Sequence, residues 1–394
     1  MTTAGASSKR PWLALVGCFI VSIGFNAYLF APASIMPSFV AAFGIDKPTA
    51  GLSISAVFLA WGLFQIPSGF LMDRYDNRKL VWAGVFLFLV VSVASLFAPT
   101  YPTFLATRFV GGITAVFLWT ANANIVSQSF PQSHRALGTS LFVASAPAGV
   151  TLAQAAGPTL EPLLGWRGVV AVYAVVTLCG LPLFVWALDE PVRNSSVLSV
   201  SKFVAALGNR RVLAIAVSSF CAYSLFVFLN SWMPTYATEV IGVDIATAGA
   251  LAALVPAMGL VARPGGGWLS DHIGGRRRPV ITAAFLLVLP ALIVAVFTTS
   301  VVGFVVALVL AGIGSQLGTG VFYVYVEELS PSESGGTSLS VLMTISIAGS
   351  LVAPVAAGWL IDVVSWTMTF AIGGLVAVCG IAALARLPKT TSSH

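Results

Sequence analysis

The chain has 394 residues, of which 58% are hydrophobic and only 8% are charged. A soluble domain carries about 25% charged residues, so this composition excludes an ordinary soluble protein and indicates one that crosses a membrane many times. The net charge is +6, but the basic residues lie in short segments between apolar runs. That placement excludes a basic domain for binding nucleic acid.

Twelve apolar runs approach the roughly 20 residues that a membrane-spanning helix needs. We therefore expect an all-α membrane protein with twelve transmembrane helices. The predicted spans are residues 12–33, 50–72, 79–98, 102–126, 136–160, 168–188, 212–235, 246–270, 279–298, 301–326, 336–361 and 367–387.

One polar segment, residues 189–211, divides the spans into two sets of six. We expect an N-terminal six-helix bundle over residues 1–188, a cytoplasmic linker over 189–211 and a C-terminal six-helix bundle over 212–394. A short interfacial helix is expected within the linker at 201–207.

Lysine and arginine are distributed unevenly between the two sides. If the N-terminus is inside the cell, 15 of the 19 basic residues lie in cytoplasmic segments, and only Lys47 and Arg167 lie outside. Positive residues concentrate on the cytoplasmic side of membrane proteins. The sequence thus predicts a multi-pass plasma-membrane protein with both termini in the cytoplasm.

Three loop sequences recur at an offset of 198 residues, which indicates a duplicated six-helix half. The stretch at 44–51 recurs at 242–249, with Asp46 and Asp244 placed to cap the helices that follow. The stretch at 138–141 recurs at 336–339. The charged loop at 69–79 recurs at 267–277, where it pairs Gly69 with Gly267, Asp73 with Asp271 and Arg78 with Arg276.

These features together resemble the major facilitator superfamily. The loop at 69–79 is similar to the family signature between spans two and three, and Arg108 with Gly111 and Gly112 is similar to a second family motif. Gly149, Gly157 and Pro158 partly resemble a motif of exporters, from which Ala153 and Glu161-Pro162 depart. The resemblance implies two pseudo-symmetric bundles around a central cavity.

The resemblance also implies that the duplicated loops gate the cytoplasmic side. Asp73 would then face the positive N-terminal end of span eleven, near Gly335, Gly336 and Thr337. The alternative is a solvated turn whose basic residues only fix the topology. The predicted gating residues are Gly69, Asp73, Arg74, Arg78, Lys79, Gly267, Asp271, Arg276 and Arg277.

Two arginines, Arg108 and Arg263, lie within spans, where a charge is costly and suggests function. All thirteen acidic residues lie in loops or near helix ends, so neither arginine has an evident buried partner and an anionic substrate becomes plausible. Other roles stay open. Arg108 could be structural and reach Glu161, and Arg263 could reach toward Glu327 or Glu328.

Polar and aromatic residues near the span centres are further candidates for lining a substrate cavity, although packing between helices would explain any one of them equally well. The candidates are Asn26, Tyr28, Gln65, Trp119, Asn122, Tyr223, Asn230, Gln316 and Tyr323. No metal-ligand or catalytic constellation is visible, so we expect no enzymatic activity, no cofactor and no metal.

We therefore predict a monomeric secondary transporter that works by alternating access and moves a small organic or inorganic anion, with or without a coupling ion. One alternative is efflux of drugs by proton antiport. An alternative of another class is a membrane sensor or receptor that does not transport.

Overall fold

A computed structural model describes residues 10–188, 191–192, 207–330, 335–385 and 387. Within those ranges every regular element is a helix. The helix expected at 201–207 lies almost entirely outside the described residues, and so does the side chain of Asp73.

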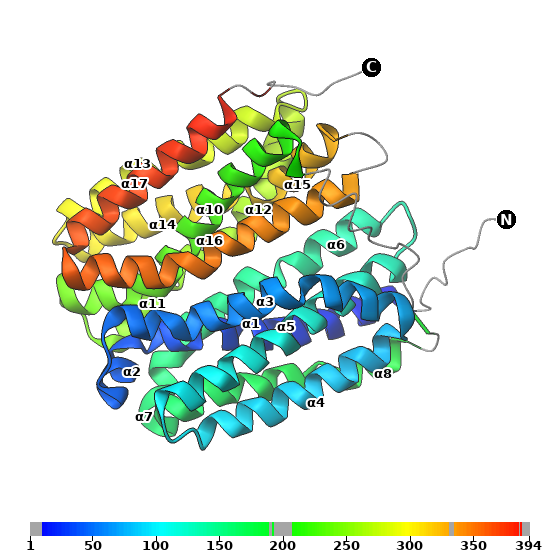
Figure 1. Ribbon diagram of the computed structural model, residues 1–394, viewed down its shortest axis with the longest axis horizontal. Helices are drawn as coiled ribbons and strands as arrows, with labels where there is room; N and C mark the ends of the chain where they lie inside the picture. Colours follow the sequence, from blue (N-terminus) through cyan, green and yellow to red (C-terminus); the bar gives the residue numbers. More distant parts are fainter. Residues whose placement is uncertain (1–9, 189–190, 193–206, 331–334, 386, 388–394) are drawn as a thin grey trace.

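The first half of the chain folds into one bundle, drawn in blue to green in Figure 1. Its helices are α1 (Pro11–Ser34), α2 (Met36–Phe43), α3 (Lys47–Arg74), α4 (Asn77–Leu96), α5 (Tyr101–Ser129), α6 (Arg135–Val143), α7 (Ser145–Cys179) and α8 (Leu181–Ala187).

The second half forms a bundle beside the first, drawn in green to red in Figure 1. Its helices are α10 (Arg210–Tyr236), the short π-helix η1 (Ala237–Ile241), α11 (Ile245–Ala252), α12 (Leu254–His272), α13 (Arg277–Phe297), α14 (Val301–Leu317), α15 (Thr319–Glu328), α16 (Gly335–Val363) and α17 (Trp366–Leu384). The exact boundaries predicted at 188 and 212 remain a prediction.

The predicted spans agree with the observed helices to within a few residues at most ends. The described residues contain 11 apolar stretches long enough to cross a membrane, one of them the 48 residues Leu137–Phe184. That stretch would reach about 72 Å as a single helix, more than twice the thickness of a bilayer core. It is divided at Gly165, whose φ of 64° breaks the helix, so the count of crossings is twelve.

Four spans predicted as continuous are interrupted, at Ala144, Gly180, Ala253 and Gly318. Proline explains the interruptions at Ala144 and Ala253. α6 ends at Val143 and α11 ends at Ala252, each four residues before a proline, Pro147 and Pro256. Proline has no N–H to donate to the carbonyl oxygen four residues earlier. The helix therefore loses a hydrogen bond where each break occurs.

The duplication is visible in the geometry of matching loops. Gly44 and Gly242 both end a helix in the left-handed region, with φ of 61° and 79°. Two residues later, Asp46 accepts a hydrogen bond from the Thr49 backbone N–H at 2.9 Å. Asp244 accepts one from the matching Thr247 N–H at 3.0 Å. Helix packing repeats as well, since α1 packs on α7 as α10 packs on α16.

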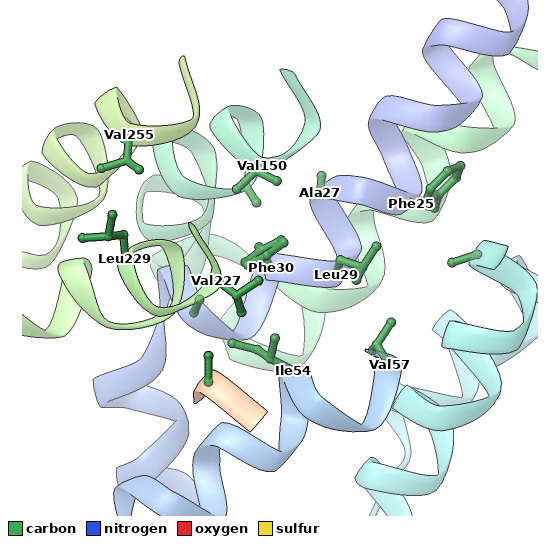
Figure 2. Close-up of a cluster of buried hydrophobic side chains, with 14 of the residues drawn as sticks. Phe25, Ala27, Leu29, Phe30, Ile54, Val57, Val150, Val227, Leu229 and Val255 are labelled. Carbon is green, nitrogen blue, oxygen red and sulfur yellow. The ribbon is translucent and has the colours of Figure 1, made fainter. Parts of the chain in front are cut away.

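The two bundles meet at the end of the molecule that carries α2, which we call the α2 end. A Cβ atom on Gly51 would lie 2.7 Å from the Pro354 carbonyl oxygen, and one on Gly249 would lie 2.5 Å from the Gln154 carbonyl oxygen. These matching glycines thus permit close approach of α3 to α16 and of α11 to α7. Figure 2 shows apolar side chains of both bundles gathered at this junction, including Phe30.

Candidate functional site

One face of α10 is turned toward the first bundle. Tyr223, Phe226 and Asn230 follow one another at helical spacing and share this face. The ring of Phe226 lies 6.2 Å from that of Phe30 in α1. The backbone carbonyl oxygen of Asn230 accepts a hydrogen bond from Nε2 of Gln154 in α7 at 2.6 Å. Side chains on this face therefore lie between the two bundles.

Arg263 of α12 lies beside this face and retains exposed surface. Its guanidinium carbon is 5.8 Å from the centre of the Phe226 ring, and its side chain is half-buried. Nε donates to Oε1 of Gln316 at 3.0 Å, and Nε2 of Gln316 donates to the Val255 carbonyl oxygen at 2.9 Å. Neither Nη1 nor Nη2 has a hydrogen-bond partner among the described residues, so four N–H donors remain available.

Two tyrosines complete the group around Arg263. The hydroxyls of Tyr223 and Tyr323 lie 2.6 Å apart in a hydrogen bond, and both side chains lie near Arg263. One hydroxyl donates to the other, which leaves one phenolic proton free to donate elsewhere. We call this group the arginine cluster, consisting of Tyr223, Phe226, Arg263, Gln316 and Tyr323.

An aromatic group joins three helices of the first bundle. Phe25 of α1, Trp61 of α3 and Trp119 of α5 have ring centres 6.3–6.5 Å apart. Trp61 donates from Nε1 to Oε1 of Gln65 at 2.9 Å, which leaves the amide N–H groups of Gln65 free to donate. Trp61, Gln65 and Trp119 are half-buried. We call Phe25, Trp61, Gln65 and Trp119 the tryptophan cluster.

Arg108 does not belong to either cluster. Its side chain has no exposed surface, and its guanidinium donates to the carbonyl oxygens of Ser53, Tyr28 and Leu29 at 2.9, 2.8 and 2.6 Å. It also lies over the Tyr28 ring, 4.2 Å from the ring centre. The expectation that Arg108 contacts substrate is wrong for this conformation, and Glu161 is not its partner. Carbonyl oxygens satisfy the cation instead.

Several other predicted lining residues are buried and bonded within the protein. Tyr28, Asn122, Asn230 and Gln316 are at most 1% exposed, and Asn26 is 7% exposed. Asn26 donates to the Ser22 carbonyl oxygen at 2.8 Å. In this conformation these side chains support the site rather than line it. Of the predicted candidates, Arg263, Gln65, Trp119, Tyr223 and Tyr323 keep exposed surface.

The duplicated charged loops lie at the opposite end of the molecule, which we call the charged-loop end. Arg277 pairs with Asp271 and, at 3.0 Å, with Glu328. The contact predicted between Arg263 and Glu327 or Glu328 is therefore not made. Asp271 pairs within its own bundle and its side chain is 71% exposed, so the gating role remains a prediction.

In the loop of the first bundle, Asp76 forms the ion pair that the structure describes. Asp76 is 7% exposed and forms an ion pair with Arg78 at 2.8 Å. Arg78 also donates to the Leu188 carbonyl oxygen at 2.9 Å. Arg74, Lys79 and Arg276 are exposed. The predicted contact of Asp73 with the start of α16 lies outside the described side chains.

Sequence reasoning missed four of these residues, Phe25, Trp61, Asp76 and Phe226. Trp61 could have been found from its spacing of four residues before Gln65, which places both on one helical face. Asp76 could have been found as a helix cap directly before Asn77. Phe25 and Phe226 carry no local signal, because their roles depend on helices far away in the chain.

Known proteins similar to this chain include transporters of organic acids. It is 24% identical to the "Probable galactarate/D-glucarate transporter GudP" of Bacillus subtilis (strain 168), over 92% of this chain and 88% of that protein. It is 23% identical to the "Gentisate transporter" of Corynebacterium glutamicum, over 100% of this chain and 91% of that protein.

The fold is also similar to a solved structure. A bacterial homologue of the human lysosomal transporter Spinster, in an inward-facing and unoccupied conformation, superposes with a TM-score of 0.74 and 17% identity, covering 96% of this chain and 95% of that one. The family model of the Major Facilitator Superfamily matches residues 14–345 and 275–394. With twelve crossings in two bundles and this match along its length, the chain belongs to the major facilitator superfamily of membrane transporters.

Proposed function

We propose that this transporter moves a small carboxylate anion, bound between the bundles at Arg263. The main supporting observation is that the guanidinium of the half-buried Arg263 has one hydrogen-bond partner and four free N–H donors among the described residues. All thirteen acids of the chain lie in loops or near helix ends, so no carboxylate near the span centres neutralises it. A carboxylate substrate would supply both the charge and the missing acceptors.

The similar proteins support this proposal. Both relatives are named for organic acids, one for galactarate and D-glucarate and the other for gentisate. Those substrates differ in shape but share the carboxylate group. A guanidinium with two free nitrogens suits this shared group, because arginine can bind a carboxylate through two parallel hydrogen bonds.

Transport by purified protein in liposomes tests the proposal. We expect counterflow of a carboxylate from a panel of aromatic and aliphatic acids, and we expect Arg263→Gln to raise the half-saturation concentration about 10–100-fold. That range corresponds to about 1.5–3 kcal/mol for hydrogen bonds to a charged group. Arg210→Gln is the matched control, because Arg210 is an exposed arginine at the start of α10.

Two results would contradict this proposal. Transport of a cationic dye with no counterflow of any carboxylate would favour drug efflux and reject the proposal. Normal affinity in Arg263→Gln would remove Arg263 from the site.

The distribution of basic residues predicts how the protein is oriented in the membrane. The charged-loop end would face the cytoplasm, because basic residues concentrate there, and contacts at the α2 end would close the outer side of an inward-facing conformation in the plasma membrane. Reporter fusions can test this. A C-terminal fusion to green fluorescent protein should fluoresce and a fusion to alkaline phosphatase should be inactive, whereas the reverse pattern would invert the orientation.

A further inference from the structure

The aromatic rings that face the junction form a connected path between the two clusters. From Arg263 the path passes over Phe226 to Phe30 at 6.2 Å and on to Phe58 of α3, also at 6.2 Å. Phe58 lies three residues before Trp61, one turn along the same helix. The rings of the first bundle and the cation of the second therefore border the same junction.

The contact between Phe30 and Phe226 divides this junction along the membrane normal. Trp61 and Gln65 lie nearer than Phe58 to the charged-loop end of α3, and Tyr223 lies nearer than Phe226 to the same end of α10. The two clusters therefore occupy the charged-loop side of the contact.

The positive charge of Arg263 lies in the second bundle, and the indole rings of Trp61 and Trp119 lie in the first. The arginine cluster offers four guanidinium N–H groups and one free phenolic proton. The tryptophan cluster offers two half-exposed indole faces and the amide N–H groups of Gln65. A ligand that spans the junction meets a strong anion site at one end and aromatic faces at the other.

We propose that the transported anion is an aromatic monocarboxylate, with its carboxylate on Arg263 and its ring against Trp61 and Trp119. This inference rests on the proposed function and narrows it. An aliphatic dicarboxylate fits less well, because its second carboxylate would lie against indole rings whose faces carry negative charge density. A hydroxyl on the ring can accept a hydrogen bond from the Gln65 amide.

Counterflow in liposomes decides between these substrates. The probes are labelled 4-hydroxybenzoate and labelled succinate, with unlabelled benzoate and cyclohexanecarboxylate as competitors of equal charge and similar size. We expect exchange of 4-hydroxybenzoate and little of succinate. We expect benzoate to compete about 2–12-fold more strongly than cyclohexanecarboxylate, the ratio that corresponds to 0.5–1.5 kcal/mol for an aromatic pair.

Variants of Trp119 test the ring contact directly. Trp119→Leu should weaken 4-hydroxybenzoate uptake at least about fivefold, while Trp119→Phe retains a ring and should stay within about twofold of wild type. Trp186→Leu is the matched control, because Trp186 is 69% exposed in α8 and should leave uptake unchanged. If Trp119→Leu does not fold, Trp119→Phe and the substrate panel on the wild-type protein still decide.

The outcomes separate this inference from the function on which it rests. Exchange of succinate without exchange of aromatic acids would overturn the inference and leave carboxylate transport intact. Equal competition by benzoate and cyclohexanecarboxylate, or normal uptake by a folded Trp119→Leu protein, would also overturn it. Exchange of no carboxylate at all would reject both.

Discussion

At the scale of single residues, the two arginines within the membrane spans have different environments and different roles. Arg108 is enclosed by three carbonyl oxygens, one of which is free because Pro32, four residues after Tyr28, has no N–H to bond it. Arg263 has one side-chain partner among the described residues and keeps exposed surface. Arg108 therefore joins three helices, and Arg263 is available to a ligand.

Replacing each arginine should separate these roles. Arg108→Leu leaves the buried Tyr28 carbonyl oxygen without a donor and removes the hydrogen bonds that join three helices, so it should destabilise the protein by about 3–5 kcal/mol. Arg263→Leu should change stability by less than about 1 kcal/mol while impairing binding. Thermal unfolding of both purified variants in detergent measures the difference. Equal losses of stability would show that Arg263 is also structural.

At the scale of elements, the loop between α3 and α4 anchors the end of the first bundle to the residues that follow α8. Asp76 accepts hydrogen bonds from the Arg78 side chain and from the Val192 backbone N–H at 3.2 Å, and the Val192 carbonyl oxygen accepts from the Asn77 N–H at 2.9 Å. Burial acts to raise the pKa of Asp76, but these hydrogen bonds and the charge of Arg78 outweigh it and lower the pKa below its ordinary value.

This lowered pKa makes the contribution of Asp76 to stability pH-dependent. A depressed pKa stabilises the folded protein above the unfolded value of about 3.9, and that stability is lost as pH falls through the folded pKa. Asp76→Asn should therefore lower the unfolding temperature at pH 7, by the equivalent of about 1–3 kcal/mol, and the gap to wild type should narrow below about pH 4.

The matched control for Asp76 is Asp271→Asn in the duplicated loop. The Asp271 side chain is 71% exposed, and Arg277 would keep its pair with Glu328. We expect Asp271→Asn to lower the unfolding temperature at pH 7 much less than Asp76→Asn does. A difference in unfolding temperature between wild type and Asp76→Asn that stays constant down to pH 3 would contradict the role assigned to the carboxylate charge.

At the scale of the whole molecule, charges close the α2 end across the two bundles. Lys47 of α3 pairs with Glu239 at 3.1 Å and with Asp362 at 3.5 Å, both in the second bundle. Its ammonium also lies 5.9 Å from the ring centre of Trp366, which donates to Glu239 at 3.1 Å. Alternating access requires these contacts to separate when the α2 end opens.

Removing the Lys47 charge should favour that opening. We expect Lys47→Met to increase the population in which the α2 end is separated, measured as a longer distance between spin labels at Ala42 and Val240, which are exposed in α2 and η1. Arg167→Met is the control, because Arg167 donates to the Ala98 carbonyl oxygen and lies over the Trp166 ring, and both residues belong to its own bundle. An unchanged distance distribution in Lys47→Met would show that these ion pairs do not hold the end closed.

Much of the fold was predictable from the sequence, because lipid imposes strong local rules. A spanning helix must satisfy its own backbone and must be apolar over its length, so the twelve crossings could be located from composition alone. The repeat at 198 residues predicted matching caps at Asp46 and Asp244, and both caps are present. The breaks after Val143 and Ala252 could also have been predicted from Pro147 and Pro256.

The site was predictable only in part. Sequence alone identified Arg108 and Arg263 as unusual charges, and it determined the family, the number of crossings and the charged loops. Only the tertiary structure decided that carbonyl oxygens enclose Arg108, that Arg263 lies beside Phe226 at the junction, and that Trp61 and Trp119 pack together in the other bundle. The physical reason is distance along the chain. Local hydropathy fixes which residues enter the membrane, but helix packing fixes which of them meet.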